Sequence, residues 1–262
     1  MYDDLIDPFT IMPTNKTAII TGGTKGIGAA IARKFYEDGY AVALGAREDN
    51  GLAKKLGSRA RFHAMDVRRE SDHEDIVKDL LGWKKRLDVY INCAGFSRWS
   101  SIAKVDEAFL TEMTDTNFKG TFWGCKVASK NLSKGGSIIN ISSIAGKRGS
   151  ANNTVYCSTK FAVTGLTQAL AKELGPRGIR VNGVCPVYIE TEGLMAVLKD
   201  RDAPPQGKDV RSYLKNFTAQ NAALGRLPSA QEVAQVCLFL SSDAASAITG
   251  QNIQVDCGVL PQ

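Results

Sequence analysis

The spacing of hydrophobic residues changes repeatedly along the chain. Short apolar runs alternate with longer segments whose apolar residues recur at helical spacing. We expect strands at 16–21, 41–45, 60–65, 87–91, 136–141, 179–184 and 252–255. We expect helices at 26–38, 70–82, 104–115, 117–132, 155–174 and 229–240. Strands that alternate with helices are typical of βαβ units, in which parallel strands build one sheet.

Some of the expected strands, such as 137–141, are almost continuously apolar, as strands buried on both faces are. The pattern therefore predicts an α/β fold: a single-domain, doubly wound, parallel, Rossmann-like sheet with helices on both faces. This domain should span 15–262, after an N-terminal extension at 1–14.

Residues 187–227 depart most from the alternation and are expected to form a substrate lid. Proline cannot continue a helix, so Pro204 and Pro205 should split this segment into helices at 192–199 and 208–221. The mixed charges of the segment indicate an exposed position rather than a deep core.

Composition removes several classes of protein. The net charge is +6, but the basic residues are scattered, which argues against a nucleic-acid-binding stripe. The six cysteines and two histidines lack the spacing of metal ligands or of a disulfide framework. The N-terminus lacks the pattern of a signal peptide, and no apolar run approaches a membrane span. We therefore expect a cytoplasmic protein without a metal, membrane or nucleic-acid partner.

A glycine-rich turn follows the first expected strand and opens the first expected helix. It reads Thr-Gly-Gly-Thr-Lys-Gly-Ile-Gly over residues 21–28. Glycine gives Gly22 and Gly26 access to backbone angles closed to other residues, and it lets helix and strand approach closely at Gly28. The N–H groups at the helix start would then face a dinucleotide pyrophosphate. The cofactor-binding set from this turn is Gly22, Thr24, Lys25, Gly26, Ile27 and Gly28. A purely structural turn is the alternative, because the spacing differs from the usual G-x-G-x-x-G.

The end of the second expected strand indicates which dinucleotide is bound. An acidic residue there holds the ribose 2′-hydroxyl of NAD. This chain has Ala46 at that position, followed by Arg47. Arginine grips a 2′-phosphate, which a carboxylate would repel, and Lys25 adds a second cation. The residues favour NADP(H), with two ordinary surface cations as the alternative.

A serine, a tyrosine and a lysine supply candidate catalytic chemistry. Ser142 and Ser143 follow an expected strand, where α/β proteins place their sites. Tyr156 and Lys160 are one helical turn apart on one face of the next helix. The pair alone is a weak signal, but it follows Ser143 and opens a long helix. An ammonium nearby lowers the pKa of a phenol, so Tyr156 would exchange a proton with a carbonyl or alcohol oxygen.

From about residue 15 to 260 the chain resembles the short-chain dehydrogenase/reductase family, and within it the 3-oxoacyl-carrier-protein-reductase-like members. The resemblance rests on motifs that occur in order: 21–28, Asp66-Val67, Asn92-Cys-Ala-Gly95, Asn117, Ser143, Tyr156-x-x-x-Lys160 and Arg180-Val-Asn-Gly-Val-Cys-Pro186.

The resemblance implies a role for each catalytic candidate. Tyr156 would be the general acid–base, and Ser143, rather than Ser142, would hold the substrate oxygen. Lys160 would bind the nicotinamide ribose and lower the pKa of Tyr156. Asn117 would hold a water that links Lys160 to solvent; a helix-capping or buried amide is its alternative.

The resemblance also implies cofactor contacts beyond the glycine turn. Asp66 and Val67 would meet the adenine, and Asn92, Ala94 and Gly95 would lie beside the ribose. Tyr156, Lys160, Pro186, Ile189 and Thr191 complete the cofactor-binding set, with Ile189 and Thr191 at the carboxamide. Residues 248–256 and 155–174 resemble surfaces that this family uses in tetramers, so a homotetramer is expected.

Three residues depart from the family pattern. Val187 replaces a glycine after Pro186, Cys93 replaces an asparagine, and Cys257 replaces a glycine near the C-terminus. None of these changes removes a catalytic group.

The sequence therefore predicts an NADPH-dependent reductase of a small-molecule carbonyl substrate, similar to 3-oxoacyl reductases. An NAD(P)-dependent sugar or polyol dehydrogenase is one alternative, against which Ala46-Arg47 argues. A non-catalytic cofactor-binding regulatory protein is another, against which the intact catalytic set argues. The candidate substrate-lining residues are Ser97, Arg98, Trp99, Arg148, Asn153 and Tyr188, in addition to parts of 192–220. Arg98 and Arg148 would hold a carboxylate or phosphate, or else be surface arginines.

Overall fold

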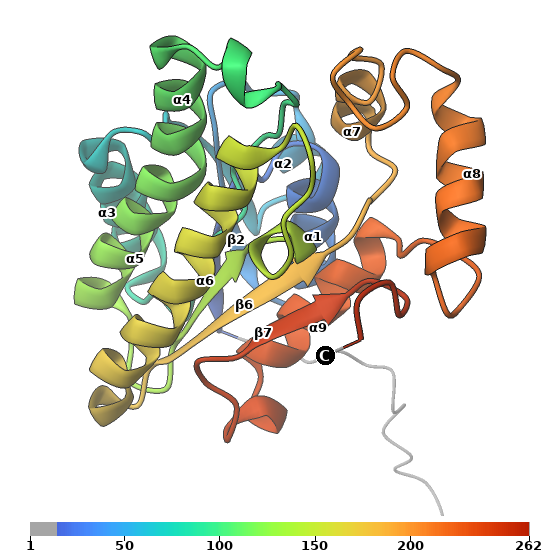
Figure 1. The fold of residues 1–262 in the computed structure, drawn as a ribbon. Helices are drawn as coiled ribbons and strands as arrows, with labels where there is room; N and C mark the ends of the chain where they lie inside the picture. The colour runs from blue at the N-terminus through green and yellow to red at the C-terminus, as the bar shows by residue number, and fades with distance from the viewer. Residues whose placement is uncertain (1–14, 262) are drawn as a thin grey trace, which may run out of the picture.

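A computed structural model describes residues 15–261, so the predicted extension at 1–14 lies outside the described residues. Within this range a single seven-stranded sheet runs through the molecule (Figure 1). Every neighbouring pair of its strands is parallel, in the order β3-β2-β1-β4-β5-β6-β7. The strands are β1 Thr17–Thr21, β2 Ala41–Ala46, β3 Ala60–Ala64, β4 Val89–Asn92, β5 Ser137–Ile141, β6 Arg180–Pro186 and β7 Asn252–Val255. The predicted doubly wound α/β class is confirmed.

All six helices predicted outside the lid are present, with shifts at their ends. They are α1 Gly26–Glu37, α3 Glu70–Lys84, α4 Glu107–Thr114, α5 Gly120–Asn131, α6 Thr154–Leu174 and α9 Ala230–Ser241. A short helix that was not predicted, α2 Leu52–Leu56, follows β2. Short 3-10 turns lie at Ile102–Lys104, Ile144–Gly146, Gly175–Arg177 and Asp243–Ala245.

Two of the predicted boundaries were wrong. α3 continues through Gly82 to Lys84 and ends where Lys85 adopts a positive φ of 62°. The expected break near residue 116 is absent, because the π-helical segment Asp115–Lys119 joins α4 to α5. A π-helical segment inside an α-helix often marks a functional site.

Alternate side chains of the strands pack into two separate hydrophobic cores. Ala18 and Ile20 of β1 face a core that includes α1 and α9. Ile19, between them, faces the opposite core with residues of α3, α5 and α6. This alternation is the period of a strand whose two faces are both covered, and it explains the continuous apolar runs.

The sheet reverses its winding between β3 and β4, because β4 returns to the far side of β1. Ligands of doubly wound folds bind beyond the carboxyl ends of the strands at such a switch point. Thr21 and Asn92, paired in the register of β1 and β4, mark this place.

The predicted lid contains two helices, α7 Glu192–Val197 and α8 Val210–Asn221, on either side of Pro204 and Pro205. The division predicted from the prolines is therefore present. Figure 1 shows both helices at the upper right, apart from the layers of the sheet. Together with Trp99 from the body, they form a third hydrophobic cluster around Leu198, Val210 and Leu214.

Among residues 15–261, no helix has both the length and the apolar character that a membrane crossing requires.

Candidate active site

The glycine turn between β1 and α1 is folded tightly against β4. Gly22 and Gly26 have φ values of 65° and 53°, which favour glycine. A Cβ on Gly22 would lie 2.9 Å from the Cα of Ala94, and one on Gly28 would overlap the carbonyl oxygen of Gly22. The predicted reasons for these glycines, unusual backbone angles and close packing, are both visible.

Hydrogen bonds hold this turn in place. The hydroxyl of Thr21 accepts from the backbone N–H groups of Cys93 and Ala94, at 3.1 and 3.2 Å. Asn50 donates from Nδ2 to the carbonyl oxygen of Thr24, at 2.6 Å. The sequence analysis did not identify Asn50, which lies in a loop without a recognisable motif.

The cations proposed for a 2′-phosphate are available at the end of β2 and in the turn. Arg47 and Lys25 are exposed. Neither forms a salt bridge within the described part of the chain. Asp66, by contrast, is held by Arg68, whose Nε and Nη2 both donate to the carboxylate. This pairing lowers the pKa of Asp66 and adds Arg68 to the residues around the expected adenine position.

Ser143, Tyr156 and Lys160 come together from β5 and α6. Ser143 follows β5, and its hydroxyl donates to the carbonyl oxygen of Pro186 at 3.4 Å. Lys160 is 5% exposed, and its Nζ donates to the carbonyl oxygen of Ile141 at 2.9 Å. The same Nζ lies 5.6 Å from the centre of the Tyr156 ring. The three predicted catalytic side chains thus share one place at the carboxyl edge of the sheet.

The pKa of Tyr156 differs from the expectation. Burial raises it to about 12, and a hydrogen bond with Ser143 offsets only part of this effect. Burial lowers the pKa of Lys160 to about 8. Burial therefore gives Tyr156 a raised pKa in this structure, opposite to the expected lowering, and the effect of Lys160 on this pKa stays a prediction. A neutral phenol is the protonation state that donates a proton to a carbonyl oxygen.

Asn117 lies in the π-helical segment and is fully buried. Its Oδ1 accepts from the N–H of Phe96 at 3.0 Å, and its Nδ2 donates to the carbonyl oxygen of Phe96 at 2.8 Å. A Cβ on Gly95 would come within 3.0 Å of Asn117 Oδ1 and 3.6 Å of Lys160 Nζ. The amide therefore fixes the loop after β4 beside Lys160, as its buried-amide alternative expected. Its role toward a water stays a prediction.

The remaining cofactor candidates border the same place but differ in what their side chains do. Asn92 is buried and donates from Nδ2 to Asn140 Oδ1 at 2.9 Å, so its amide is hydrogen-bonded inside the core.

The candidates on the segment after β6 lie nearer the predicted lid. Ile189 is buried after β6. Thr191 caps α7 by accepting from the N–H of Leu194, and its Cγ2 would lie 3.4 Å from a Cβ on Gly26. Thr191, at the start of the predicted lid, therefore lies close to the glycine turn. Ala94 contacts the turn as described, and the buried Val67 lies against Gly120 of α5.

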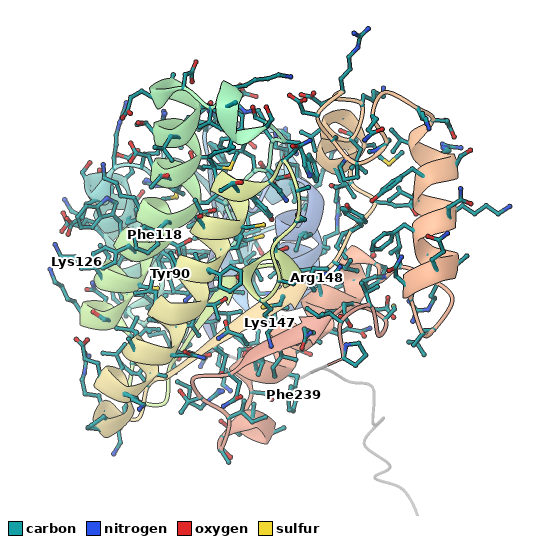
Figure 2. The ribbon with its side chains drawn as sticks, in the orientation of Figure 1. Tyr90, Phe118, Lys126, Lys147, Arg148 and Phe239 are labelled. Carbon is teal, nitrogen blue, oxygen red and sulfur yellow. The ribbon has the colours of Figure 1, made fainter. Side chains whose placement is uncertain are left out.

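The two arginines considered for anion binding differ. Arg98 pairs with Glu112 at 2.7 Å and lies over the rings of Phe96 and Phe109. Its charge is therefore paired with a carboxylate of the protein itself. Arg148 is exposed, without a salt bridge among residues 15–261. Figure 2 shows Lys147 and Arg148 close together on the segment before α6.

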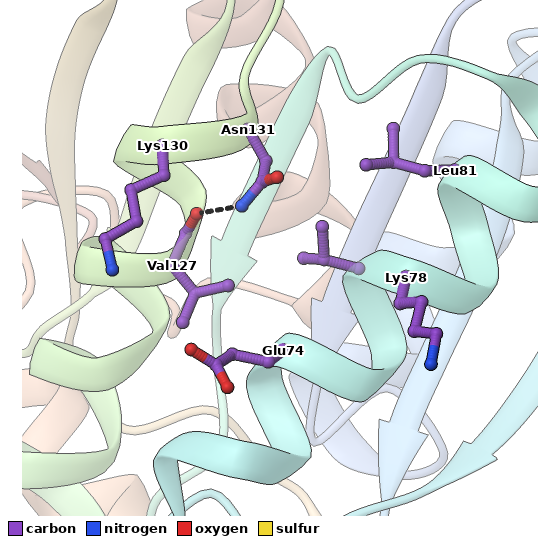
Figure 3. Close-up of a pocket in the computed structure, with 7 residues that line it drawn as sticks. Glu74, Lys78, Leu81, Val127, Lys130 and Asn131 are labelled. Atoms are coloured by element: carbon purple, nitrogen blue, oxygen red, sulfur yellow. Dashed lines mark hydrogen bonds between the residues drawn. The ribbon is translucent and has the colours of Figure 1, made fainter.

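A separate groove lies between α3 and α5 (Figure 3). Glu74, Lys78 and Leu81 line one side, and Val127, Lys130 and Asn131 line the other. None of the candidate catalytic or cofactor residues lines it, so it is not part of this site.

A Rossmann-like sheet with a glycine turn and a serine, tyrosine and lysine at its switch-point edge defines a dinucleotide-dependent oxidoreductase. A family model described as enoyl-(acyl carrier protein) reductase matches residues 22–260. The chain belongs to the short-chain dehydrogenase/reductase family, among its 3-oxoacyl-reductase-like members, and is an enzyme that uses a nicotinamide cofactor.

Named relatives cover almost the whole chain. The chain is 35% identical over 254 residues to the 3-oxoacyl-[acyl-carrier-protein] reductase FabG of Chlamydia muridarum, covering 94% of this chain and 97% of the relative. It is 35% identical over 257 residues to diacetyl reductase [(S)-acetoin forming] of Staphylococcus aureus, covering 95% and 99%. A solved short-chain dehydrogenase/reductase titled glucose/ribitol dehydrogenase, from Brucella melitensis, superposes with a TM-score of 0.85 at 33% identity and covers 95% and 98%.

Proposed function

We propose that this enzyme reduces a ketone to an alcohol with NADPH, in the manner of a 3-oxoacyl reductase. The observation that carries the proposal is the meeting of Ser143, Tyr156 and Lys160 at the carboxyl edge of the sheet. Relatives whose names describe ketone reduction support it.

Ser143, Tyr156 and Lys160 each have a separate role in the transfer of the proton. Ser143 and Tyr156 hold the carbonyl oxygen of the substrate, and the neutral phenol of Tyr156 transfers its proton to that oxygen. The bound nicotinamide supplies the hydride that the carbonyl carbon accepts. Lys160, whose charged form is favoured below its pKa of about 8, stabilises the phenolate that remains on Tyr156.

Side chains on the cofactor side fit NADPH. The backbone of the glycine turn leaves no room for a Cβ on Gly22 or Gly28, which keeps its N–H groups close to a pyrophosphate. Arg47 and Lys25 have no salt bridge within residues 15–261 and are free for a 2′-phosphate. The same residues count against an NAD-dependent polyol dehydrogenase, and the intact proton donor counts against a regulatory protein without turnover.

The function is tested by following NADPH oxidation with three kinds of substrate: a 3-oxoacyl thioester, small ketones, and an enoyl thioester. We expect ketones to be reduced and the enoyl thioester to be left intact, because Tyr156 is placed to protonate an oxygen. Reduction of only the enoyl thioester, or of none of them, would refute the proposal.

The lid is proposed to close over the nicotinamide end of the site. Its polar contacts to the body include Asp202, which pairs with Lys104 at 3.1 Å and accepts at its carbonyl oxygen from Asn152 Nδ2 at 3.1 Å. Tyr188 and Tyr213 link α8 to the loop after β6 through their hydroxyls at 3.3 Å. Because exposed ion pairs are weak, we expect residues 192–222 to exchange amide hydrogens quickly in the free enzyme. Exchange should slow with NADPH and substrate; identical exchange in both states would contradict the lid.

A homotetramer is proposed from the family resemblance of α6 and the segment around β7. Light scattering should give about four times the 28.2 kDa mass of one chain. A mass of one chain at assay concentration would exclude this assembly. The expected cytoplasmic location stays a prediction.

A further inference from the structure

A histidine and a tyrosine form a buried polar pair beside the loop that follows β3. His73 lies near the start of α3 and Tyr90 lies in β4, and both side chains are fully buried. His73 Nδ1 is 2.7 Å from the hydroxyl of Tyr90, and His73 Nε2 is 2.9 Å from the carbonyl oxygen of Val67. Burying polar groups costs free energy that an apolar pair would not cost, so the pair requires a reason beyond packing.

The chemistry of the partners fixes the direction of both hydrogen bonds. A carbonyl oxygen only accepts, so His73 donates from Nε2 to Val67. Burial lowers the pKa of His73, which favours the neutral ring with a single N–H at pH 7. Nδ1 is then an acceptor, and the hydroxyl of Tyr90 donates to it. Two consecutive hydrogen bonds thus connect the central sheet to the backbone of Val67.

The residue before Val67 is held from the same helix. Asp72, next to His73, accepts at Oδ2 from the N–H of Asp66 at 2.8 Å. The start of α3 therefore holds two successive residues of the loop, one through an acceptor and one through a donor.

Two glycines of α5 enclose the loop and the pair from the other side. A Cβ on Gly120 would lie 2.8 Å from Cγ2 of Val67, and one on Gly124 would lie 3.0 Å from Cε1 of Tyr90. The two glycines are one helical turn apart, so a single face of α5 covers both residues. Close packing on this face leaves the hydrogen bonds of His73 to set where Val67 lies.

This loop lies at the edge of the sheet where the cofactor is expected. The N–H of Met65 donates to the carbonyl oxygen of Ala46 at 3.0 Å, which continues the pairing of β3 with β2 beyond their last residues. The chain then passes through Asp66 and Val67, beside the end of β2 that leads to Arg47. The catalytic candidates follow β5, which lies on the other side of β1 and β4. A displaced Val67 would therefore affect the adenine end of the site before the reacting end.

We propose that His73 is a positioning residue for the cofactor: held by Tyr90, it fixes the backbone of Val67 and with it the adenine end of the NADPH site. This inference rests on the proposed function, in which Asp66 and Val67 contact the adenine. Loss of the pair should weaken the binding of ligands that contain adenine and leave the rate of the bound complex unchanged.

The test separates binding from turnover. We measure KM and kcat for NADPH with a ketone that the enzyme reduces. Calorimetry gives the Kd of adenosine 2′,5′-bisphosphate, which has the adenine and the 2′-phosphate but no nicotinamide. His73→Leu removes both hydrogen bonds of the ring. KM and Kd should rise together by about tenfold, the factor that one net hydrogen bond represents, while kcat stays within about twofold of the wild type.

Three further variants show whether the hydrogen bonds are the cause. His73→Gln supplies a donor and an acceptor in one side chain and should keep KM and Kd within about twofold of the wild type. Tyr90→Phe removes only the hydroxyl and should raise both by about threefold. Tyr40→Phe makes the same change at a tyrosine that is 2% exposed and precedes β2, at the opposite edge of the sheet. It should leave both constants unchanged.

The outcomes distinguish this inference from the proposed function. If the wild-type enzyme reduces no ketone, the proposed function fails, and the Kd of the bisphosphate still tests His73. If His73→Leu leaves KM and Kd unchanged, or lowers kcat alone, the positioning role is overturned. An equal rise in Tyr40→Phe would also overturn it, because it would show a general effect of lost stability. Should His73→Leu not fold, unchanged constants in Tyr90→Phe would overturn the inference.

Discussion

Tyr156→Phe is expected to lower ketone reduction by about 100-fold or more, because it removes the phenolic proton beside Ser143 and Lys160. The substitution keeps the ring, so the packing at the start of α6 should persist. NADPH affinity should change little, since the glycine turn and Arg47 are untouched. Steady-state rates and a fluorescence titration of NADPH measure the two effects separately.

Tyr36→Phe is the matched control. Tyr36 lies on α1. The guanidinium carbon of Arg59 lies 4.0 Å from the centre of its ring, a contact that phenylalanine would keep. This variant should reduce ketones at the wild-type rate. Normal turnover by Tyr156→Phe would show that another group donates the proton.

The sequence predicted the sheet and the meeting of Ser143, Tyr156 and Lys160 because both depend on local pattern. Short, almost continuous apolar runs and turn glycines identify strands, and the Tyr156–Lys160 spacing places two side chains on one helical face. Residues that act only through long-range contacts could not be predicted from such local patterns. Asn50, which holds the carbonyl of Thr24, and Arg68, which holds Asp66, belong to this group.

Helix ends failed where tertiary packing overrides local preference. Gly82 suggested an end, but α3 runs on to Lys84, with its buried face formed by residues such as Ile76 and Leu80. A π-helical segment at residues 115–119 takes the place of the expected break between two helices, so α4 and α5 remain joined. That segment carries Asn117, and the amide reaches Phe96 only because of where the fold places it.

The pKa of Tyr156 depends on burial, which the spacing of residues along the sequence does not show. The sequence shows a lysine one turn away, which by itself lowers the pKa. It does not show that both groups are withdrawn from water, which raises the pKa of the phenol and lowers that of the amine. Which effect dominates is decided by burial, a property of the whole fold.

The second large effect is expected at the end of β2. Arg47→Asp should weaken NADPH binding by about 10- to 100-fold, because it removes a charge-assisted hydrogen bond to the 2′-phosphate and adds a repulsive charge. NADH, which has no 2′-phosphate, should lose little, and the carboxylate can accept from its ribose hydroxyl. The ratio of kcat/KM for NADPH to that for NADH should therefore fall sharply.

Arg177→Asp makes the same change of net charge at a distant place. Arg177 is exposed in the turn between α6 and β6, which precedes the amino end of β6, whereas the candidate site lies at the carboxyl edge of the sheet. Because exposed charges separated by more than a Debye length are screened, this variant should keep the wild-type cofactor ratio. An equal loss in both variants would indicate a general electrostatic effect instead of a contact. Equal use of NADH and NADPH by the unmodified enzyme would remove the basis for assigning Arg47 to the 2′-phosphate.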